Sequence, residues 1–167
     1  MLKGLLMKRR VYVETTIVSY LTGRPSGDLL IAARQLLTRQ WWDEESKNHE
    51  LMVSNVVLEE VAEGNAEQAA KRMALIEGVV VIEISDDVKD VAEALIHSCS
   101  IPASSYYDAL HIAICAVYDI DLLLTWNCKH LANPFMLPKI YGVLQALGYS
   151  SPLIVTPEQL LEVSNAE

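Results

Sequence analysis

Short apolar runs alternate with helical segments along the whole chain, and this alternation is the feature that most constrains its fold. Five runs rich in β-branched residues or leucine are expected to form strands, at 10–14, 51–54, 79–84, 122–126 and 153–155. The segments between them repeat apolar residues at the spacing of amphipathic helices. Strands that alternate with helices pair mostly in parallel, and the helices cover the sheet. The sequence therefore predicts an α/β protein with a mostly parallel central sheet of about five strands.

Polar residues that favour helix N-termini precede several of the predicted helices. Thr15 and Thr16 follow the first predicted strand and are expected to cap the short helix after it. Ser85 precedes two acidic residues, which the helix dipole favours in a first turn. Asn65 and Thr156 each stand three residues before a glutamine, which is the arrangement of a capping box. These residues predict where four of the helices begin.

Length and composition favour one well-packed domain. The chain has 167 residues, of which 51% are hydrophobic, so it can bury a large core. We expect a single domain at 10–163, with an N-terminal extension at 1–9 and a C-terminal tail at 164–167. No apolar run approaches the ~18 residues that a membrane span requires. The apolar stretch near the N-terminus is also too short for a signal peptide. These observations predict a soluble, cytoplasmic protein with no membrane partner.

The three cysteines, Cys99, Cys115 and Cys128, lack the paired spacing of a disulfide framework or a zinc site. An odd, unclustered set of this kind fits a reducing compartment. Cys99 and Cys115 lie in apolar helical patterns, so we expect both thiols to be buried and inert.

The net charge of −9 disfavours tight nucleic-acid binding by the isolated chain. Phosphate contacts normally come from lysine and arginine. Carboxylates that bind a metal nevertheless add negative charge, and the bound cation offsets part of it. A basic partner would offset more of it. The acidity therefore does not exclude a nuclease.

In four places an acidic or amide side chain stands at the end of an apolar run or at the start of an apolar helix. Glu14 closes the first strand, Glu59 and Glu60 lie on the helix after the second, Asp108 opens an apolar helix, and Asn127 follows the fourth strand. Adjacent helix residues point about 100° apart, so at most one of Glu59 and Glu60 can face a shared site. Oxygen ligands from separate strand and helix ends are how an α/β fold builds a Mg²⁺ or Mn²⁺ site. Such a site indicates metal-assisted phosphodiester hydrolysis.

Each of these residues also has a purely structural interpretation. Glu14 can be a solvated charge or a helix cap, and Asn127 can cap the turn that follows it. Asp108 is favourable against the helix dipole without any function, although a carboxylate on a buried helix is costly unless it is paired or metal-bound. His111 lies one turn after Asp108 on the same face. It either orients Asp108 through a hydrogen bond or is a core histidine with satisfied nitrogens.

Taken together, these segments resemble the PIN-domain ribonucleases, and within them the VapC-like toxins of type II toxin–antitoxin systems. The resemblance covers residues 11–160 and rests on the order and spacing of four motifs, at 12–20, 54–64, 108–113 and 123–133. It implies a PIN-like three-layer α/β/α fold. It also implies a metal-dependent endoribonuclease that hydrolyses RNA phosphodiester bonds and is the toxin of a toxin–antitoxin pair.

The resemblance implies a role for each site residue. Glu14, Glu60 and Asp108 would hold one or two Mg²⁺ or Mn²⁺ ions, and Asn127 would help to position the attacking water. The family pattern favours Glu60 over Glu59, because a glycine follows Glu60 four positions later. Glu14 and Asn127 replace residues that are usually aspartate or another acid in the family. Both replacements bear on metal affinity and on the catalytic rate.

Substrate contacts and partners follow from the same resemblance. Thr15 and Thr16 are expected to contact a phosphate through hydroxyl or backbone amide groups. Arg24 and Lys129 are the nearest basic residues by motif position, and they either contact the RNA backbone or form surface salt bridges. The implied partners are an RNA substrate, a cognate antitoxin protein and a second copy of the chain.

Trp41 and Trp42 are adjacent, so one helix cannot readily bury both in a single core. One of them is expected either to anchor a homodimer or partner interface or to cover the end of the domain's own core.

Two other functions compete with the nuclease. A PIN fold without nuclease activity, serving as a binding or scaffold module, is favoured by Glu14, Asn127 and the acidic composition. A receiver-like phosphoacceptor domain needs an aspartate at the end of the central strand and a lysine at the end of a late one. Ser85 and Thr156 follow the strands in question, so the sequence excludes the receiver reading.

Overall fold

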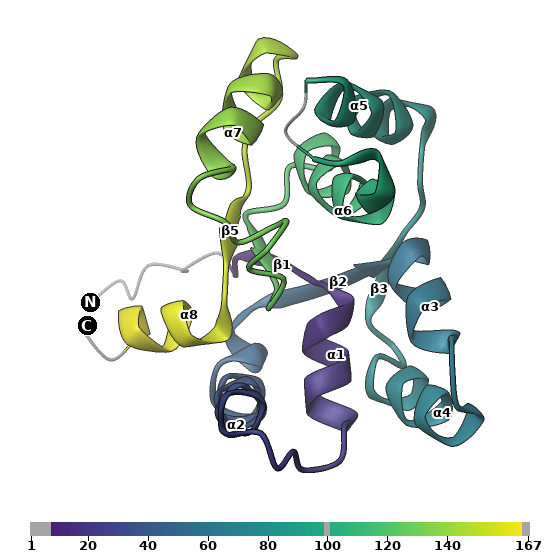
Figure 1. Ribbon diagram of the computed structural model, residues 1–167, viewed down its shortest axis with the longest axis vertical. Coiled ribbons are helices and arrows are strands. Elements are labelled where there is room, and N and C mark those ends of the chain that lie inside the picture. The colour runs from purple at the N-terminus through teal and green to yellow at the C-terminus, as the bar shows by residue number, and fades with distance from the viewer. Residues whose placement is uncertain (1–7, 99–100, 165–167) are drawn as a thin grey trace, which may run out of the picture.

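A computed structural model describes residues 8–98 and 101–164 of the chain. Within these residues the chain forms one five-stranded sheet in which every neighbouring pair is parallel, in the order β3-β2-β1-β4-β5 (Figure 1). The strands are β1 (Arg10–Val13), β2 (Glu50–Ser54), β3 (Val80–Ile82), β4 (Leu122–Leu124) and β5 (Leu153–Val155). The prediction of an α/β fold with a parallel sheet of about five strands is confirmed.

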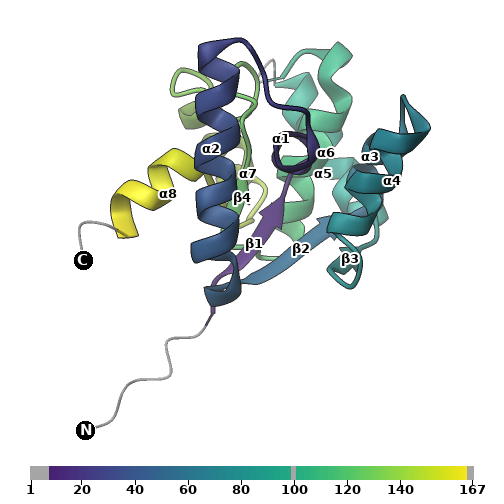
Figure 2. The same ribbon diagram turned by 90° about the horizontal axis from the view of Figure 1, so that it is seen from below.

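Helices cover the sheet on both sides, which gives the predicted three-layer arrangement. The helices are α1 (Thr15–Thr22), α2 (Leu29–Glu44), α3 (Asn55–Ala62), α4 (Ala66–Leu75), α5 (Asp86–His97), α6 (Tyr106–Val117), α7 (Leu137–Ala146) and α8 (Pro157–Ser164). Short 3₁₀ helices lie at Ser46–Asn48 and Ala103–Ser105. In both ribbon views α5, α6 and α7 lie on one side of the sheet, and α1, α2 and α8 lie on the other (Figures 1 and 2). No helix in the described part of the chain is both long and apolar enough to span a membrane.

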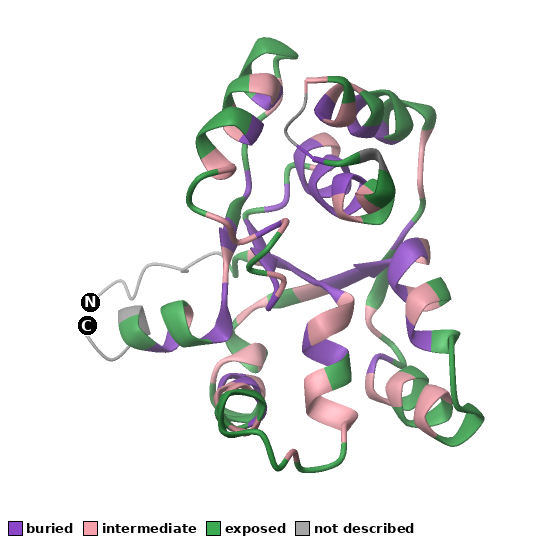
Figure 3. Cartoon of the chain, in the orientation of Figure 1, coloured by how far each residue is buried: buried purple, intermediate pink, exposed green. Residues whose placement is uncertain are grey.

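The core is built around the two central strands and α6 (Figure 3). Every residue of β4 is buried, and so are the last three residues of β1. Because helices cover both faces of a parallel sheet, its central strands are apolar throughout rather than alternating. In α6 the run from Ala109 to Ala116 is buried, which explains why that segment is apolar almost all round. Fully burying one large apolar side chain stabilises the fold by roughly 1.5–3 kcal/mol.

The parallel pairing brings several strand ends to one edge of the sheet. Val13 of β1 pairs with Leu124 of β4, and β2 ends nearby at Ser54. The backbone of Glu14 then donates to the carbonyl oxygen of Leu124 at 3.1 Å, so the residues after β1 and β4 stay together. The polar and acidic residues that follow these strands therefore meet at the carboxyl edge of the sheet.

Most of the predicted helix starts are confirmed, and one is corrected. At α8 the Gln159 side chain accepts from the Thr156 amide at 2.9 Å, and the Thr156 hydroxyl accepts from the Gln159 amide at 3.3 Å, so this capping box is complete. Asn65 caps α4 and Ser85 caps α5. The expected threonine caps of α1 are wrong.

The N-cap of α1 is Glu14, whose carboxylate accepts from the amide of Thr16. The hydroxyls of Thr15 and Thr16 instead donate to carboxylates of the site. The third and fourth strands are also shorter than expected, at three residues each. After β4 the chain turns so that Thr125 faces Glu14, although its amide still pairs with the carbonyl of Val155 at 3.0 Å.

The predictions for the cysteines and tryptophans are partly tested. Cys115 is buried as expected, Cys128 is exposed, and Cys99 lies outside the described residues. Trp41 is fully buried, whereas Trp42 is half-buried and packs against the same core. The pair therefore covers the domain's own core. One helix achieves this because Trp41 points inward while Trp42 lies against the margin.

Candidate active site

A pocket of about 420 Å³ opens at the carboxyl edge of the sheet. It is lined by Glu14, Thr15, Thr16, Ser19, Tyr20, Glu60, Asp108 and Asn127. The four residues singled out from the sequence as site residues therefore meet in one place, although they are far apart in the chain. Of the expected substrate contacts, Thr15 and Thr16 line the pocket. Arg24 and Lys129 are exposed and do not line it.

Glu14 is a buried carboxylate held entirely by neutral donors. Its side chain is 4% exposed. The hydroxyls of Thr16 and Thr125 donate to Oε2 at 2.5 and 2.6 Å, and the Thr16 amide donates to Oε1 at 3.2 Å. Burial raises the pKa of Glu14, and nearby His111 and the three hydrogen bonds only partly oppose that rise. The ionised carboxylate is therefore costly here unless a cation compensates for it.

The threonines that hold Glu14 are themselves fixed by the backbone after β4. The Thr16 hydroxyl accepts from the amide of Trp126 at 2.8 Å, and the Thr125 hydroxyl accepts from the amide of Asn127 at 2.9 Å. Each hydroxyl thus donates to the carboxylate and accepts from the chain. This arrangement fixes the direction of both O–H bonds and leaves neither Oγ proton for a substrate phosphate.

Glu60 enters the pocket from α3, whereas its neighbour Glu59 is exposed. Its Oε2 accepts from the Thr15 hydroxyl at 2.5 Å and lies 3.1 Å from Nε2 of His111. Partial burial alone would raise the pKa of Glu60, but hydrogen bonding and charge attraction from His111, together with the bond from Thr15, outweigh it and lower the pKa. Glu60 is therefore the better-stabilised anion of the site.

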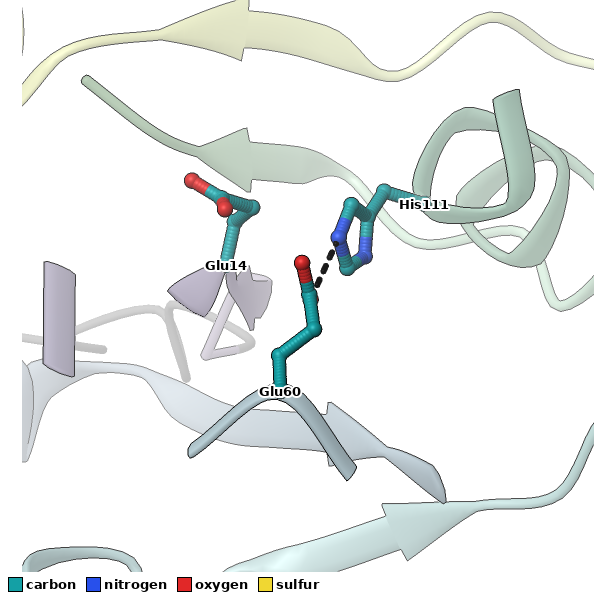
Figure 4. Close-up of side chains that lie close together, drawn as sticks. All are labelled: Glu14, Glu60 and His111. Atoms are coloured by element: carbon teal, nitrogen blue, oxygen red, sulfur yellow. Dashed lines mark ion pairs between the residues drawn. The ribbon is translucent and has the colours of Figure 1, made fainter. Parts of the chain in front are cut away.

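His111 belongs to a buried chain of hydrogen bonds that ends on Glu60. Its Nδ1 lies 2.7 Å from the Tyr12 hydroxyl, which lies 2.7 Å from the hydroxyl of Ser54. Figure 4 shows the imidazole, on α6, facing Glu60 beside Glu14. The structure therefore supports the interpretation of His111 as a core histidine with satisfied nitrogens, and the carboxylate that it contacts is Glu60 rather than Asp108.

Counting protons gives the direction of the hydrogen bonds from Ser54 through Tyr12 and His111 to Glu60. When the imidazole is neutral, Ser54 donates to Tyr12, Tyr12 donates to Nδ1 of His111, and Nε2 carries the ring proton and donates it to Glu60. Every hydroxyl and ring proton is then used. Burial alone would lower the pKa of His111, but the hydrogen bond that it donates to Glu60 and the surrounding carboxylates raise it. Tyr12 was missed from the sequence, where its only signal is a polar tip inside an otherwise apolar strand.

Asn127 faces Asp108 with its amide nitrogen. Nδ2 donates to Oδ1 of Asp108 at 2.9 Å, while Oδ1 of Asn127 accepts from the backbone amide of His130 at 3.0 Å. The two contacts fix the orientation of the amide, because one partner can only accept and the other can only donate. Burial raises the pKa of Asp108, with partial opposition from His111 and His130. In this arrangement Asn127 orients Asp108 and caps the following turn.

The donor set fits a hard divalent cation. A carboxylate oxygen of Glu14 and one of Glu60 lie within 4.8 Å of each other and of a ring nitrogen of His111, but both ring nitrogens are already hydrogen-bonded, so the carboxylates are the available ligands. Oε2 of each glutamate is occupied by two donors, so Oε1 of each keeps a lone pair for a cation. In the described residues no lysine or arginine forms an ion pair with Glu14, Glu60 or Asp108. Carboxylate oxygens in such a place favour Mg²⁺ or Mn²⁺.

The fold and the pocket define an α/β protein with a candidate divalent-metal centre at the carboxyl edge of a parallel sheet. The chain belongs to the PIN domain family, whose match covers residues 11–129 and so includes all four site residues. No curated protein matches the sequence.

Two solved structures share the fold at low sequence identity. VapBC2 from Rickettsia felis, bound to a DNA fragment from its promoter, is 13% identical, with a TM-score of 0.57; the alignment covers 88% of this chain and 98% of that one. VapC20 from Mycobacterium tuberculosis, described as a toxin that cleaves the sarcin–ricin loop, is 18% identical, with a TM-score of 0.53 and coverage of 84% and 96%. These similarities support the family assignment at the level of the fold.

Proposed function

We propose that the protein is a metal-dependent endoribonuclease and the toxin of a toxin–antitoxin pair. The observation that carries the proposal is the meeting of Glu14, Glu60 and Asp108 in one pocket of a PIN domain, where no lysine or arginine of the described residues pairs with them. Grouped carboxylates without a counter-charge are expensive, and a divalent cation is the compensation that also serves phosphodiester chemistry.

Glu14, Glu60 and Asp108 would hold Mg²⁺ or Mn²⁺, with Asn127 orienting Asp108. When bound, the cation would lower the pKa of water and offset the charge that develops on the phosphate. Thr16 and Thr125 hold Glu14 in place, and the Tyr12–His111 chain does the same for Glu60. The chain thereby supplies fixed carboxylates, which do not need to reorganise during the reaction.

Partners follow from the same proposal. VapC20 is described as acting on the sarcin–ricin loop, and VapBC2 was solved with promoter DNA. By analogy we expect an RNA substrate with unpaired bases, a cognate antitoxin protein, a homodimer and a cytoplasmic location. Of Thr15 and Thr16, Thr15 remains a candidate phosphate contact through its backbone amide, because both hydroxyls and the Thr16 amide already donate to carboxylates.

The test is cleavage of a structured RNA by the purified chain with Mn²⁺, with wild type compared with Asp108→Asn. Asp108→Asn keeps the side-chain shape and removes the charge, so it addresses metal binding rather than packing. We expect cleavage by wild type and none by the variant. Equal cleavage by both would indicate a contaminating nuclease. Absence of cleavage by either would support the competing proposal.

The competing proposal is a PIN-fold binding or scaffold module without catalysis. The orientation of Asn127 favours it, because the amide oxygen already accepts from His130 and offers little to a cation. Calorimetric titration with Mn²⁺ distinguishes the two functions. The nuclease proposal requires Mn²⁺ binding. If the chain neither binds Mn²⁺ nor cleaves RNA, both results support the scaffold function.

A further inference from the structure

Arg34 is a basic residue without an acidic partner in an acidic protein. Its guanidinium carbon lies 5.2 Å from the centre of the Trp126 ring. In the described residues this guanidinium has no hydrogen bond and no ion pair. By contrast, Lys71 and Lys89 pair with acids, and Arg10 and Arg72 donate to backbone carbonyls. All five donors of Arg34 are therefore available, although the residue is only partly exposed.

The position of Arg34 places this free cation at the pocket side of the molecule. α2 ends at Glu44 and the chain then enters β2 at its amino end, so α2 runs opposite to the strands (Figure 2). The first half of α2, which contains Arg34, thus lies toward the carboxyl edge. Trp126 directly precedes Asn127, and its ring meets the ring of Tyr20 edge-on, with the ring centres 6.2 Å apart. Tyr20 lines the pocket, so a short path of contacts joins the pocket wall to Arg34.

Trp126 is itself held firmly, so Arg34 rests on a fixed platform. The indole is 5% exposed, and its Nε1 donates to the Thr38 hydroxyl at 2.7 Å, one turn further along α2. A guanidinium stacked on an indole keeps its planar fork free at the edges. That fork matches the geometry of a phosphate, with two parallel N–H···O bonds.

We infer that Arg34 binds a backbone phosphate of a single-stranded RNA that also enters the pocket. The inference rests on the proposed ribonuclease function and adds the residue that grips the strand. It also resolves a difficulty of composition. A chain with a net charge of −9 repels a polyanion, so a cation near the pocket must be kept free of its own carboxylates.

The test measures RNA binding in the full chain carrying Asp108→Asn, so that the bound strand is not cleaved. The probe is a short fluorescein-labelled single-stranded RNA with Mn²⁺ present. Arg34→Gln should weaken binding about tenfold and reduce the slope of log K against log salt by about 0.7. Arg34→Lys should keep the slope and give intermediate affinity, because it keeps the charge but loses the fork. In the active wild-type background, Arg34→Gln should raise KM with little change in kcat.

Arg9→Gln is the matched control, because it removes the same charge at the opposite, amino edge of the sheet, where Arg9 is exposed. It should leave the affinity and the slope near their starting values. If Arg34→Gln and Arg9→Gln reduced RNA affinity equally, the loss would come from the change in net charge and not from the position of Arg34. That result would overturn the inference. Unchanged binding by Arg34→Gln would overturn it too, while leaving the ribonuclease proposal intact. Failure of the Arg34-intact parent to bind RNA, together with no RNA cleavage by wild type in Mn²⁺, would overturn both.

Discussion

Glu14 has two roles, and they have opposite effects on the stability of the fold. It caps α1 through the Thr16 amide, which stabilises the fold, and it places a carboxylate in a buried position, which costs free energy when ionised. A glutamine there would remove the charge, but its single oxygen can accept either from the Thr16 amide or from the two threonine hydroxyls, not from both. The substitution therefore sets the cost of the buried charge against the loss of one set of hydrogen bonds.

We predict that Glu14→Gln raises the stability of the metal-free protein by about 1 kcal/mol, or roughly 3 °C in Tm. Burial raises the pKa of Glu14 above its ordinary value of 4.5, so the folded state holds the proton more tightly than the unfolded state does. Wild type therefore loses stability relative to the variant as the pH rises from about 4.5 through the folded pKa. Thermal unfolding across this range, with chelator present, measures the difference.

The same variant should lose the stabilisation that Mn²⁺ confers on wild type, because one of the proposed ligands becomes neutral. Thr22→Val is a suitable control, because it removes a hydroxyl from α1 whose only recorded bond, to the Val18 carbonyl, lies outside the pocket. A Glu14→Gln chain that is less stable than wild type without metal, yet still gains from Mn²⁺, would contradict the prediction.

Asn127→Asp should tighten Mn²⁺ binding about tenfold while destabilising the metal-free protein by about 1–3 kcal/mol. The new carboxylate would stand where Nδ2 now donates to Asp108 at 2.9 Å, so two like charges would meet unless a cation lies between them. Asn133→Asp adds the same charge outside the pocket, where the amide donates to the Lys129 carbonyl. Calorimetry with Mn²⁺ and urea unfolding of the three chains measure both effects. If the two variants changed Mn²⁺ affinity and stability equally, the effects would not depend on the position of residue 127 in the pocket, and the prediction would be contradicted.

At the scale of the elements, β1, β2 and α6 are tied together by one buried chain of polar groups. Tyr12 contributes the central hydroxyl, between Ser54 on β2 and His111 on α6. Its ring is fully buried, and burial raises its pKa well above the ordinary value, so the phenol stays protonated. The chain ends on Glu60 of α3, so four elements share it.

Tyr12→Phe should cost about 1–3 kcal/mol, because Nδ1 of His111 would be left without its donor in an apolar interior. It should also weaken Mn²⁺ binding about tenfold, since a group that orients a proposed ligand is lost. Tyr118→Phe is the matched control, because that hydroxyl donates to the Glu83 carbonyl at an exposed position. Urea unfolding and calorimetry measure the two effects, and ¹⁵N NMR of the imidazole reports whether Nε2 carries the proton. A wild-type imidazole protonated on Nδ1 alone would contradict the assigned direction.

Sequence patterns predicted the elements well, because local signals control them. Buried strands such as β4 read as continuous apolar runs, and the Thr156–Gln159 capping box is visible in the letters. The choice of Glu60 over Glu59 came from family spacing, since helix geometry alone leaves either residue possible. The hydrogen bonds that hold the site side chains could not be predicted, because they join segments that are distant in the sequence.

The side chains that hold the site illustrate this limit. Tyr12 and His111 are 99 residues apart, and the sequence gives no sign that their ring atoms meet. The orientation of Asn127 depends on where the backbone amide of His130 falls after the turn. Arg34 lies outside the sequence motifs, and it reaches the site only because the fold packs α2 against the end of β4.

At the scale of the whole molecule, the exposed side chains of α2 bear on whether the protein forms a homodimer. α2 leaves Leu29, Leu30 and Leu36 more than half exposed, at 88%, 62% and 65%. Exposed apolar side chains on one helix indicate a candidate interaction surface. Trp42 is half-buried against its own core, which supports the second of its two expected roles, covering the end of that core.

We predict that the purified chain is a homodimer at micromolar concentration. Sedimentation velocity measures the mass directly, and a run at high salt shows whether the apolar surface is responsible, because apolar association does not weaken as salt screens charge. A monomer throughout the concentration series would contradict the prediction. That result would leave the pocket and its proposed chemistry untouched.

The amide at position 127 bears on how the chain folds without an ion. When the chain folds without an ion, each extra carboxylate in the pocket opposes closure of the core. Because Asn127 donates to Asp108, the pocket closes with a hydrogen bond at the place where an acid would introduce repulsion. The metal-free chain therefore avoids one contact between like charges on folding, and it needs no ion to relieve that contact.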